Sequence, residues 1–338
     1  MNDEPAKISL KTCLNKLLDK TSSLDISPMM KLKILRLYIP SQISFDLRVN
    51  NMSHTWIAQN LDSLVINAVN TWLDMPWNTC TKEVLELPRN SGGHDILLPS
   101  TMTMKLRLSL RYSLRHNVNE DLRRIFQETF SDEPRIDNLI FGHQDKQAAL
   151  KELNISTKAM NLDHVFGLKS QGRILKTIID TFSKSAIKDW SLQLDSLPDH
   201  LFRFIRKACQ QQLPTASNLH LWKKVESDRC KLCGARQTNK HVLNNCSSTK
   251  VLERYKNRHD NVLSILANWI KNRVGPDFEL FVDLPEPDFK SPAEIFNNRR
   301  PDIVVKHNSR LITLELTICH ETNAASSRDY TKYLSTVI

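Results

Sequence analysis

The segment 230–246 reads CKLCGARQTNKHVLNNC and has the spacing C-x2-C-x7-H-x4-C. Two cysteines separated by two residues can occupy adjacent corners of a tetrahedron, and Gly234 directly after them gives the turn its conformational freedom. Four protein ligands leave no open coordination position, so the pattern predicts a structural rather than a catalytic Zn²⁺ site. The predicted ligands are Cys230, Cys233, His241 and Cys246. The alternative is that four such residues fall in this order by chance.

The sequence on either side of this knuckle is strongly basic. Residues 223–258 contain ten Lys and Arg against three Asp and Glu, within a chain whose net charge is +10. Such a field suits a polyanion, because each neutralised phosphate releases condensed counterions. The predicted nucleic-acid contacts are Lys223, Lys224, Arg229, Lys231, Arg236, Lys240, Arg254 and Lys256. A solvated basic surface without a ligand is the alternative.

Further along, two acids lie in a pattern typical of a β-hairpin. Residues 300–306 and 311–317 are rich in β-branched side chains, and the residues between them favour a turn. If Lys306 pairs with Leu311, the numbers of opposite residues sum to 617, and Asp302 faces Glu315 with Cβ atoms about 5 Å apart. Facing carboxylates repel each other unless a cation such as Mg²⁺ neutralises them. A slip of one residue would separate the pair, and two solvated acids are the alternative.

A lysine near the C-terminal end is a further candidate. Residues 326–329 read Ser-Ser-Arg-Asp, which is typical of a helix start and places Lys332 in the first turns of a helix. A lysine near a metal could stabilise the extra negative charge of a phosphoryl transition state. Surface exposure is the ordinary alternative for Lys332.

Most of the remaining sequence predicts helices. Helical spacing of apolar residues occurs at about 8–40 (two helices, bounded by Pro28 and Pro40), 58–74, 101–117 (a basic helix), 144–153, 170–185, 198–212 and 249–273. In the last of these we expect Val262, Ile265, Leu266, Trp269 and Ile270 to face inward. Residues 276–300 are expected to form a loop.

Composition narrows the functional class. The 338 residues are enough for two or three domains, and no apolar run approaches the length that spans a bilayer. Seven cysteines, an odd number, favour metal binding in a reducing intracellular compartment over a disulfide framework. No Asp-Asp pair is present to hold two polymerase metals, so we expect no polymerase activity from this chain alone.

The motifs of the C-terminal part also resemble a known family. The knuckle is followed by Tyr255-x-x-Arg258-His259-Asp260, then by Arg300-Pro301-Asp302, Glu315 thirteen positions later and Lys332 seventeen beyond that. This order is similar to the endonuclease of site-specific non-LTR retrotransposon proteins, which join a reverse transcriptase to a restriction-like endonuclease. The resemblance covers about residues 223–338.

The resemblance implies a PD-(D/E)xK-like core that uses Mg²⁺ and nicks target DNA, so that the new 3′ end primes reverse transcription. It implies catalytic roles for Asp302, Glu315 and Lys332, with Asp302 and Glu315 as Mg²⁺ ligands. Arg258 and His259 would be accessory site residues. Asp260 replaces the asparagine common in the family and is not carried over.

The N-terminal part resembles the helical thumb that follows a reverse transcriptase palm. The residues that carry this are 28–40 and the Gly-Gly-His-Asp-Ile segment at 92–96, where Asp95 replaces the usual glycine. The expected organisation is an all-α thumb-like region at 1–125, a mixed helical connector at 126–222, a CCHC zinc knuckle at 223–250 and a truncated α/β restriction-endonuclease-like core at 251–338. Both ends resemble the edges of a fragment or of a truncated gene copy.

The sequence therefore predicts part of a retrotransposon-encoded reverse transcriptase/endonuclease. Its expected partners are target DNA and the element RNA, in the nucleus, with no membrane and no small-molecule substrate. Two alternatives remain: a catalytically inactive nucleic-acid-binding remnant, and a zinc-stabilised interaction protein whose basic charge is incidental.

Overall fold

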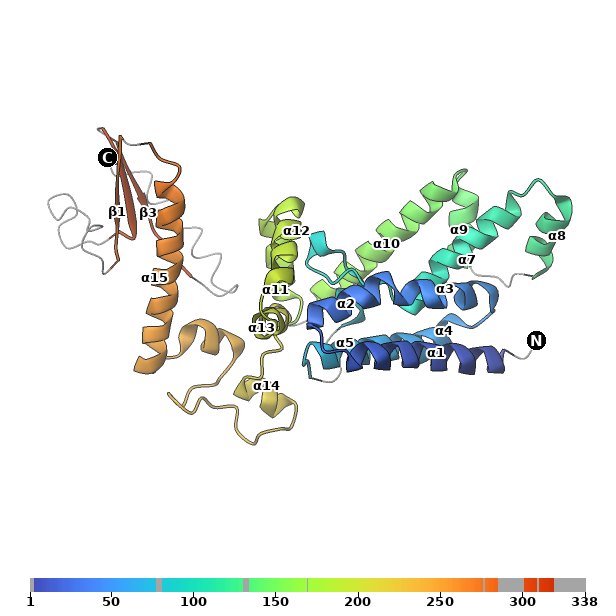
Figure 1. The fold of residues 1–338 in the computed structure, drawn as a ribbon, viewed down its shortest axis with the longest axis horizontal. Coiled ribbons are helices and arrows are strands. Elements are labelled where there is room, and N and C mark those ends of the chain that lie inside the picture. The colour runs from blue at the N-terminus through green and yellow to red at the C-terminus, as the bar shows by residue number, and fades with distance from the viewer. Residues whose placement is uncertain are drawn as a thin grey trace. The chain divides into compact units, whose positions relative to one another are not determined.

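The computed structural model describes residues 3–76, 81–129, 134–168, 170–275, 277–284, 301–308 and 310–318. The chain divides into two compact units, Met1–Leu213 and Pro214–Ile338. Most of the described residues are helical, and the second unit adds a small antiparallel sheet (Figure 1). The division after Leu213 falls inside the expected connector, and the finer boundaries at 125, 222 and 250 stay predictions.

Helices make up the first unit in its described part. They are α1 (Glu4–Ser23), α2 (Pro28–Leu37), α3 (Ile39–Val49), α4 (His54–Ile57), α5 (Ser63–Trp72), α6 (Lys82–Glu86), α7 (Pro99–Arg115), α8 (Glu120–Thr129), α9 (Pro134–Gly142), α10 (Lys146–Gly167), α11 (Arg173–Thr181), α12 (Lys184–Gln193) and α13 (Asp199–Cys209). A π-helical turn, η1 (Ala58–Asp62), joins α4 to α5, and two 3₁₀ turns are η2 (Arg89–Ser91) and η3 (Leu194–Ser196).

Local sequence explains several helix starts. Ser27 accepts a hydrogen bond from the backbone N–H of Met30 at the start of α2, and Pro28 occupies the first turn, where its missing N–H costs nothing. Pro40 lies beyond the end of α2, as expected, and it also sits in the first turn of α3. That position suits proline for the same reason, so one proline follows one helix and opens another.

The core of the first unit forms where α1, α3 and α5 pack together (Figure 1). Leu10, Leu14 and Leu18 recur along one face of α1 and are almost fully buried. The expected basic helix is α7, but two of its cations do not face solvent. Arg107 donates to the backbone carbonyl of Met52, and Arg111 is 3.2 Å from an Asp137 carboxylate oxygen. Those charges serve internal packing rather than an exposed basic stripe.

In its described part, the second unit contains two further helices, a π-helical turn and a sheet. They are α14 (Ala216–Leu221), η4 (His241–Asn245), α15 (Thr249–Lys271), β1 (Phe278–Val282), β2 (Ile303–His307) and β3 (Arg310–Leu314). The sheet has the order β1-β2-β3 and is antiparallel throughout. Residues 276–300 were expected to be a loop, and that prediction was wrong for β1. Its alternating Phe-Glu-Leu-Phe-Val sequence pairs with β2, and Phe278 stacks on His307 with ring centroids 4.1 Å apart.

The predicted hairpin register is confirmed. Lys306 pairs with Leu311 and Ile303 with Leu314, so the numbers of paired residues sum to 617 as expected. His307 and Arg310, which were expected in the connecting loop, also pair and shorten the turn.

Helix α15 lies alongside this sheet (Figure 1), but only part of the expected face is turned toward it, where Ile270 packs against the apolar cluster. Leu263 and Ala267 are buried against the sheet, whereas Ile265 and Trp269 are 69% and 53% exposed. Apolar residues surround much of the C-terminal half of α15, so helical spacing alone selects more than one face. Among the described residues, no helix is long and apolar enough to span a membrane.

Candidate functional site

The structure brings the four predicted zinc ligands into one cluster. The ligand atoms of Cys230, Cys233, His241 and Cys246 all lie within 4.8 Å of one another. Cys233 Sγ is 3.4 Å from His241 Nε2 and 3.8 Å from Cys246 Sγ. Three thiols and one imidazole are the donor set of structural zinc sites, so these residues could hold a metal ion.

A short turn positions the first two ligands. Gly234 has φ +74°, which is a left-handed conformation that glycine adopts without strain. Its N–H donates to the carbonyl of Cys230 at 2.8 Å, and the Cys230 N–H donates to the carbonyl of Ala235 at 2.7 Å. The flanking residues Arg229 and Arg236 form an antiparallel bridge. The C-x2-C spacing therefore folds as the sequence predicts, with both thiols on one side of the turn.

The cysteine thiols are arranged for a cation. Desolvation opposes ionisation of Cys230, but hydrogen bonds from the backbone of Leu232 and Cys233 lower the pKa of its thiol to about 6. A hydrogen bond at the Ser248 backbone lowers the pKa of Cys246, yet burial and the neighbouring thiols outweigh it and raise that pKa. Adjacent thiolates repel each other unless a metal ion lies between them.

Tyr255 of α15 ties the cluster to the helix that follows it. Its hydroxyl donates to the carbonyl oxygens of His241 and Val242, each at 2.9 Å, and accepts from the Cys246 N–H at 3.2 Å. Two of these partners are ligand residues. In the sequence Tyr255 is one residue of the family-like motif, and its hydrogen bonds to the predicted metal ligands were not expected.

The predicted basic contacts lie between and on either side of the cluster residues in the sequence. Seven of the eight side chains are exposed, and Lys240 is half-buried. Arg236 is engaged, since its Nε lies 2.9 Å from an Asp228 carboxylate oxygen. The exposed cations are Lys223, Lys224, Arg229, Lys231, Arg236, Arg254 and Lys256.

A second cluster forms where the start of β2 and the end of β3 meet the middle of α15. Continuing the hairpin register by one position places Asp302 opposite Glu315, and the carboxyl of Glu315 is hydrogen-bonded to Asp302. Desolvation raises the pKa of Glu315, and the Asp302 charge raises it further. One oxygen of Asp302 accepts the Leu316 N–H at 2.6 Å. The predicted pair is therefore together, in an arrangement that favours a shared proton or a bound cation.

His259 reaches the same place from α15. Its Nε2 is 3.5 Å from Asp302 Oδ2 and 3.2 Å from the carbonyl oxygen of Leu316, and its Nδ1 is 3.2 Å from Asp260 Oδ1. Desolvation lowers the pKa of His259, but the hydrogen bond to Asp260 and the charge of Asp302 outweigh it and raise that pKa. Asp260 was left out of the predicted site, yet its carboxylate orients the imidazole of His259. Its position directly after His259 was the sequence feature that could have indicated this contact.

The other two predicted residues are placed differently. The Arg258 guanidinium lies 5.2 Å from the centroid of the Tyr255 ring, on the side of α15 toward the knuckle. Lys332 lies outside the described residues.

The carboxylate pair fits the ligand preference of Mg²⁺. This ion is commonly held by one or two carboxylates and keeps several waters. Among the described residues, the cysteine and histidine cluster is the group in which three or more possible side-chain ligands gather. Asp302 and Glu315 would therefore supply two side-chain ligands to a bound Mg²⁺. The remaining coordination positions would be left to water and substrate oxygens.

Comparison with known proteins does not assign the chain to a family. No model of a protein family matches the chain, and no curated protein matches it.

Proposed function

We propose that the chain is the C-terminal part of a retrotransposon-encoded reverse transcriptase/endonuclease and that its second unit nicks DNA. The observation that carries this proposal is the contact of Asp302 with both Glu315 and His259. Two acids and an imidazole from separate elements meet beside a basic, metal-binding knuckle. Target DNA in the nucleus and the element RNA are the proposed partners.

Each residue of the carboxylate cluster has a proposed task. Asp302 and Glu315 would hold Mg²⁺, which when bound lowers the pKa of a coordinated water and so supplies a nucleophile for the phosphodiester. The Leu316 N–H and the His259 imidazole would hold the Asp302 carboxylate in place. The raised pKa of His259 favours its protonated form, whose positive charge would help to hold the Asp302 carboxylate.

The knuckle would have a structural and a binding role. Zinc held by three thiolates and one imidazole has no open position for substrate, so it would stabilise the local fold. The exposed cations around it would contact the phosphate backbone, which supplies affinity without reading sequence.

A second candidate is a nucleic-acid-binding protein without nuclease chemistry. The observation that favours it is the engagement of Asp302, one oxygen of which already accepts the Leu316 N–H and faces His259. In that case the exposed cations around the knuckle would bind nucleic acid, and the acids would only hold the hairpin to α15.

Nicking of supercoiled plasmid separates the two candidates. The variants are Asp302→Asn and Glu315→Gln, which remove charge but keep a side-chain oxygen that can accept hydrogen bonds. Asp277→Asn is the matched control, because it removes the same charge from an exposed position in the same unit. All proteins are compared in Mg²⁺, in Ca²⁺ and with chelator at one salt concentration.

We expect Mg²⁺-dependent nicking that falls by about 100-fold or more in Asp302→Asn and Glu315→Gln and is unchanged in Asp277→Asn, since loss of a catalytic charge typically costs that much. Nicking that survives both substitutions would disprove the assigned site. Tight, salt-dependent plasmid binding without any nicking would instead support the second candidate.

A further inference from the structure

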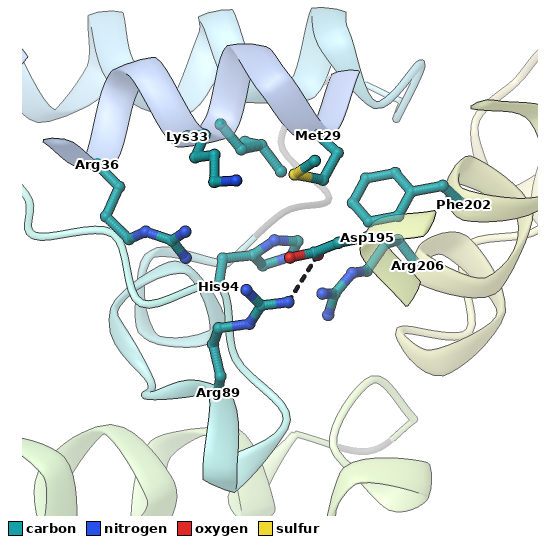
Figure 2. A pocket seen from close by; sticks show the side chains of 9 residues that line it. Met29, Lys33, Arg36, Arg89, His94, Asp195, Phe202 and Arg206 are labelled. Atoms are coloured by element: carbon teal, nitrogen blue, oxygen red, sulfur yellow. Dashed lines mark hydrogen bonds and ion pairs between the residues drawn. The ribbon is translucent and has the colours of Figure 1, made fainter. Parts of the chain in front are cut away.

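A hollow in the first unit gathers an unusual number of cations. Its empty space, counting the open solvent at its mouth, is about 270 Å³, and it lies between α2, the turn around η2, η3 and α13. Figure 2 shows the side chains of Arg36, Arg89 and Arg206 pointing toward the ring of His94, with Lys33 above them. This hollow belongs to the helical unit and not to the unit that contains the knuckle and the carboxylates.

The charges that line the hollow are mostly positive. Four cationic side chains, Lys33, Arg36, Arg89 and Arg206, line it together with one carboxylate, that of Asp195. The Asp195 carboxylate is already bound by Arg89 at 2.6 Å. Among the residues that line the hollow, four cations against one carboxylate give a net positive charge.

His94 forms the floor and has unsatisfied polar atoms. It is 5% exposed, and neither ring nitrogen has a hydrogen-bond partner among the described residues. Buried polar atoms are normally hydrogen-bonded, so an orphaned imidazole in a folded core indicates a missing partner. Burial, together with the charges of Arg206, Arg89 and Arg36, depresses the pKa of His94. The same three positive charges beside the ring favour an anion over a cation as the missing partner.

The backbone holds the imidazole in this position. Gly92 has φ +76° and Asp95 has φ +56°, so a residue in the left-handed conformation lies on each side of Gly93 and His94. The His94 N–H donates to the carbonyl of Val84 at 3.2 Å, and the Asp95 N–H donates to the carbonyl of Leu87 at 2.9 Å. The turn is therefore fixed at both ends, and His94 is directed into the hollow rather than being free to rotate outward.

We infer that this hollow binds one phosphate group, with an imidazole N–H of His94 and the guanidinium groups of Arg36 and Arg206 contacting its oxygens. Arginine suits this role because its planar fork of N–H donors matches phosphate oxygens. Lys33, exposed at the mouth, would add charge that attracts the anion. The phosphate could be a phosphodiester of bound nucleic acid or free phosphate, and the inference does not rest on the proposed nuclease.

The test compares two probes and three variants of the full chain. Inorganic phosphate is titrated calorimetrically, and a fluorescent single-stranded DNA oligonucleotide is titrated by anisotropy in phosphate-free buffer. Arg36→Gln removes a half-exposed rim cation, and His94→Phe keeps a ring while removing both nitrogens. Arg48→Gln is the matched control, because it removes the same charge from an exposed site on α3 that does not line the hollow.

We expect Arg36→Gln and His94→Phe each to weaken phosphate binding by about tenfold, the effect of losing one charge-assisted hydrogen bond. Arg48→Gln should change it by less than about twofold, as surface charges contribute little. A matching loss for the oligonucleotide would identify the phosphate as part of nucleic acid, and a loss for inorganic phosphate alone would identify free phosphate. Absence of saturable phosphate binding, or equal losses in Arg36→Gln and Arg48→Gln, would overturn the inference.

Discussion

The hydroxyl of Tyr255 offers a direct test of how the knuckle is held to α15. Tyr255→Phe removes one oxygen that contacts the carbonyl groups of His241 and Val242 and the N–H of Cys246. The single hydroxyl proton is shared between two carbonyls, so the substitution removes about two effective hydrogen bonds, each contributing about 0.5–1.5 kcal/mol. The expected loss is about 2 kcal/mol, or roughly 30-fold in an equilibrium constant.

This loss should appear in the affinity for zinc. A small knuckle has little core of its own, so metal binding and local folding are coupled, and weakening the folded form weakens Zn²⁺ binding. Competition with a chromogenic zinc chelator at constant pH measures the difference. Tyr38→Phe is the control, because Tyr38 is 67% exposed and lies in the first unit.

An affinity for Zn²⁺ within twofold of the unsubstituted chain would refute the reasoning. It would mean that the knuckle folds around its metal without the Tyr255 hydroxyl and that the hydroxyl contacts are incidental. Equal losses in Tyr255→Phe and Tyr38→Phe would refute it as well, since the control removes no contact with a ligand residue.

Two further predictions concern the turn that carries His94. Gly93→Ala should lower the free energy of unfolding by about 2–4 kcal/mol in chemical denaturation, because the added Cβ would lie 1.9 Å from the backbone oxygen of Leu87; Gly142→Ala, where nothing lies within 4 Å, should lower it by little or nothing. The pKa of His94 is depressed below its ordinary 6.5, chiefly by burial, so below pH 6.5 the unfolded chain binds more protons than the folded chain. The contribution of His94 to the free energy of unfolding should therefore be fully present above pH 6.5 and fall as the pH drops below it. The slope of the free energy of unfolding against pH is at most about 1.4 kcal/mol per pH unit. In phosphate-free buffer, His94→Gln should flatten this slope, and His200→Gln, at an exposed position, should not.

The local features of this protein were predictable from short stretches of sequence. The four metal ligands lie within seventeen consecutive residues, and the spacing of Cys230 and Cys233 around Gly234 specifies the turn that brings their thiols together. The register of β2 and β3 follows from a short turn between two β-branched runs, so the pairing of Lys306 with Leu311 could be derived by counting. In both cases neighbouring residues determine the geometry, with little contribution from the rest of the fold.

Contacts between distant segments were not predictable in this way. His259 and Asp302 are separated by 43 positions, and only the packing of α15 against the sheet brings the imidazole within 3.5 Å of the carboxylate. The same packing selects Leu263 and Ala267, rather than Trp269, as the buried face of α15. The sequence predicts that Arg111, on a basic helix, is exposed to solvent, yet in the folded unit the Asp137 carboxylate lies beside its guanidinium group.

Short-range sequence was therefore enough to predict the chemical groups and their local geometry: the cysteine and histidine cluster that could hold a metal ion, the hairpin that pairs Asp302 with Glu315, and the basic character of the surrounding chain. Tertiary structure decided which of several apolar faces is buried, which charges are neutralised internally and which residues, such as Asp260 and His94, join or form a site. The physical reason is that turns and strand registers depend on short-range sterics and hydrogen bonding, whereas burial and long-range contacts depend on how the whole apolar surface is packed.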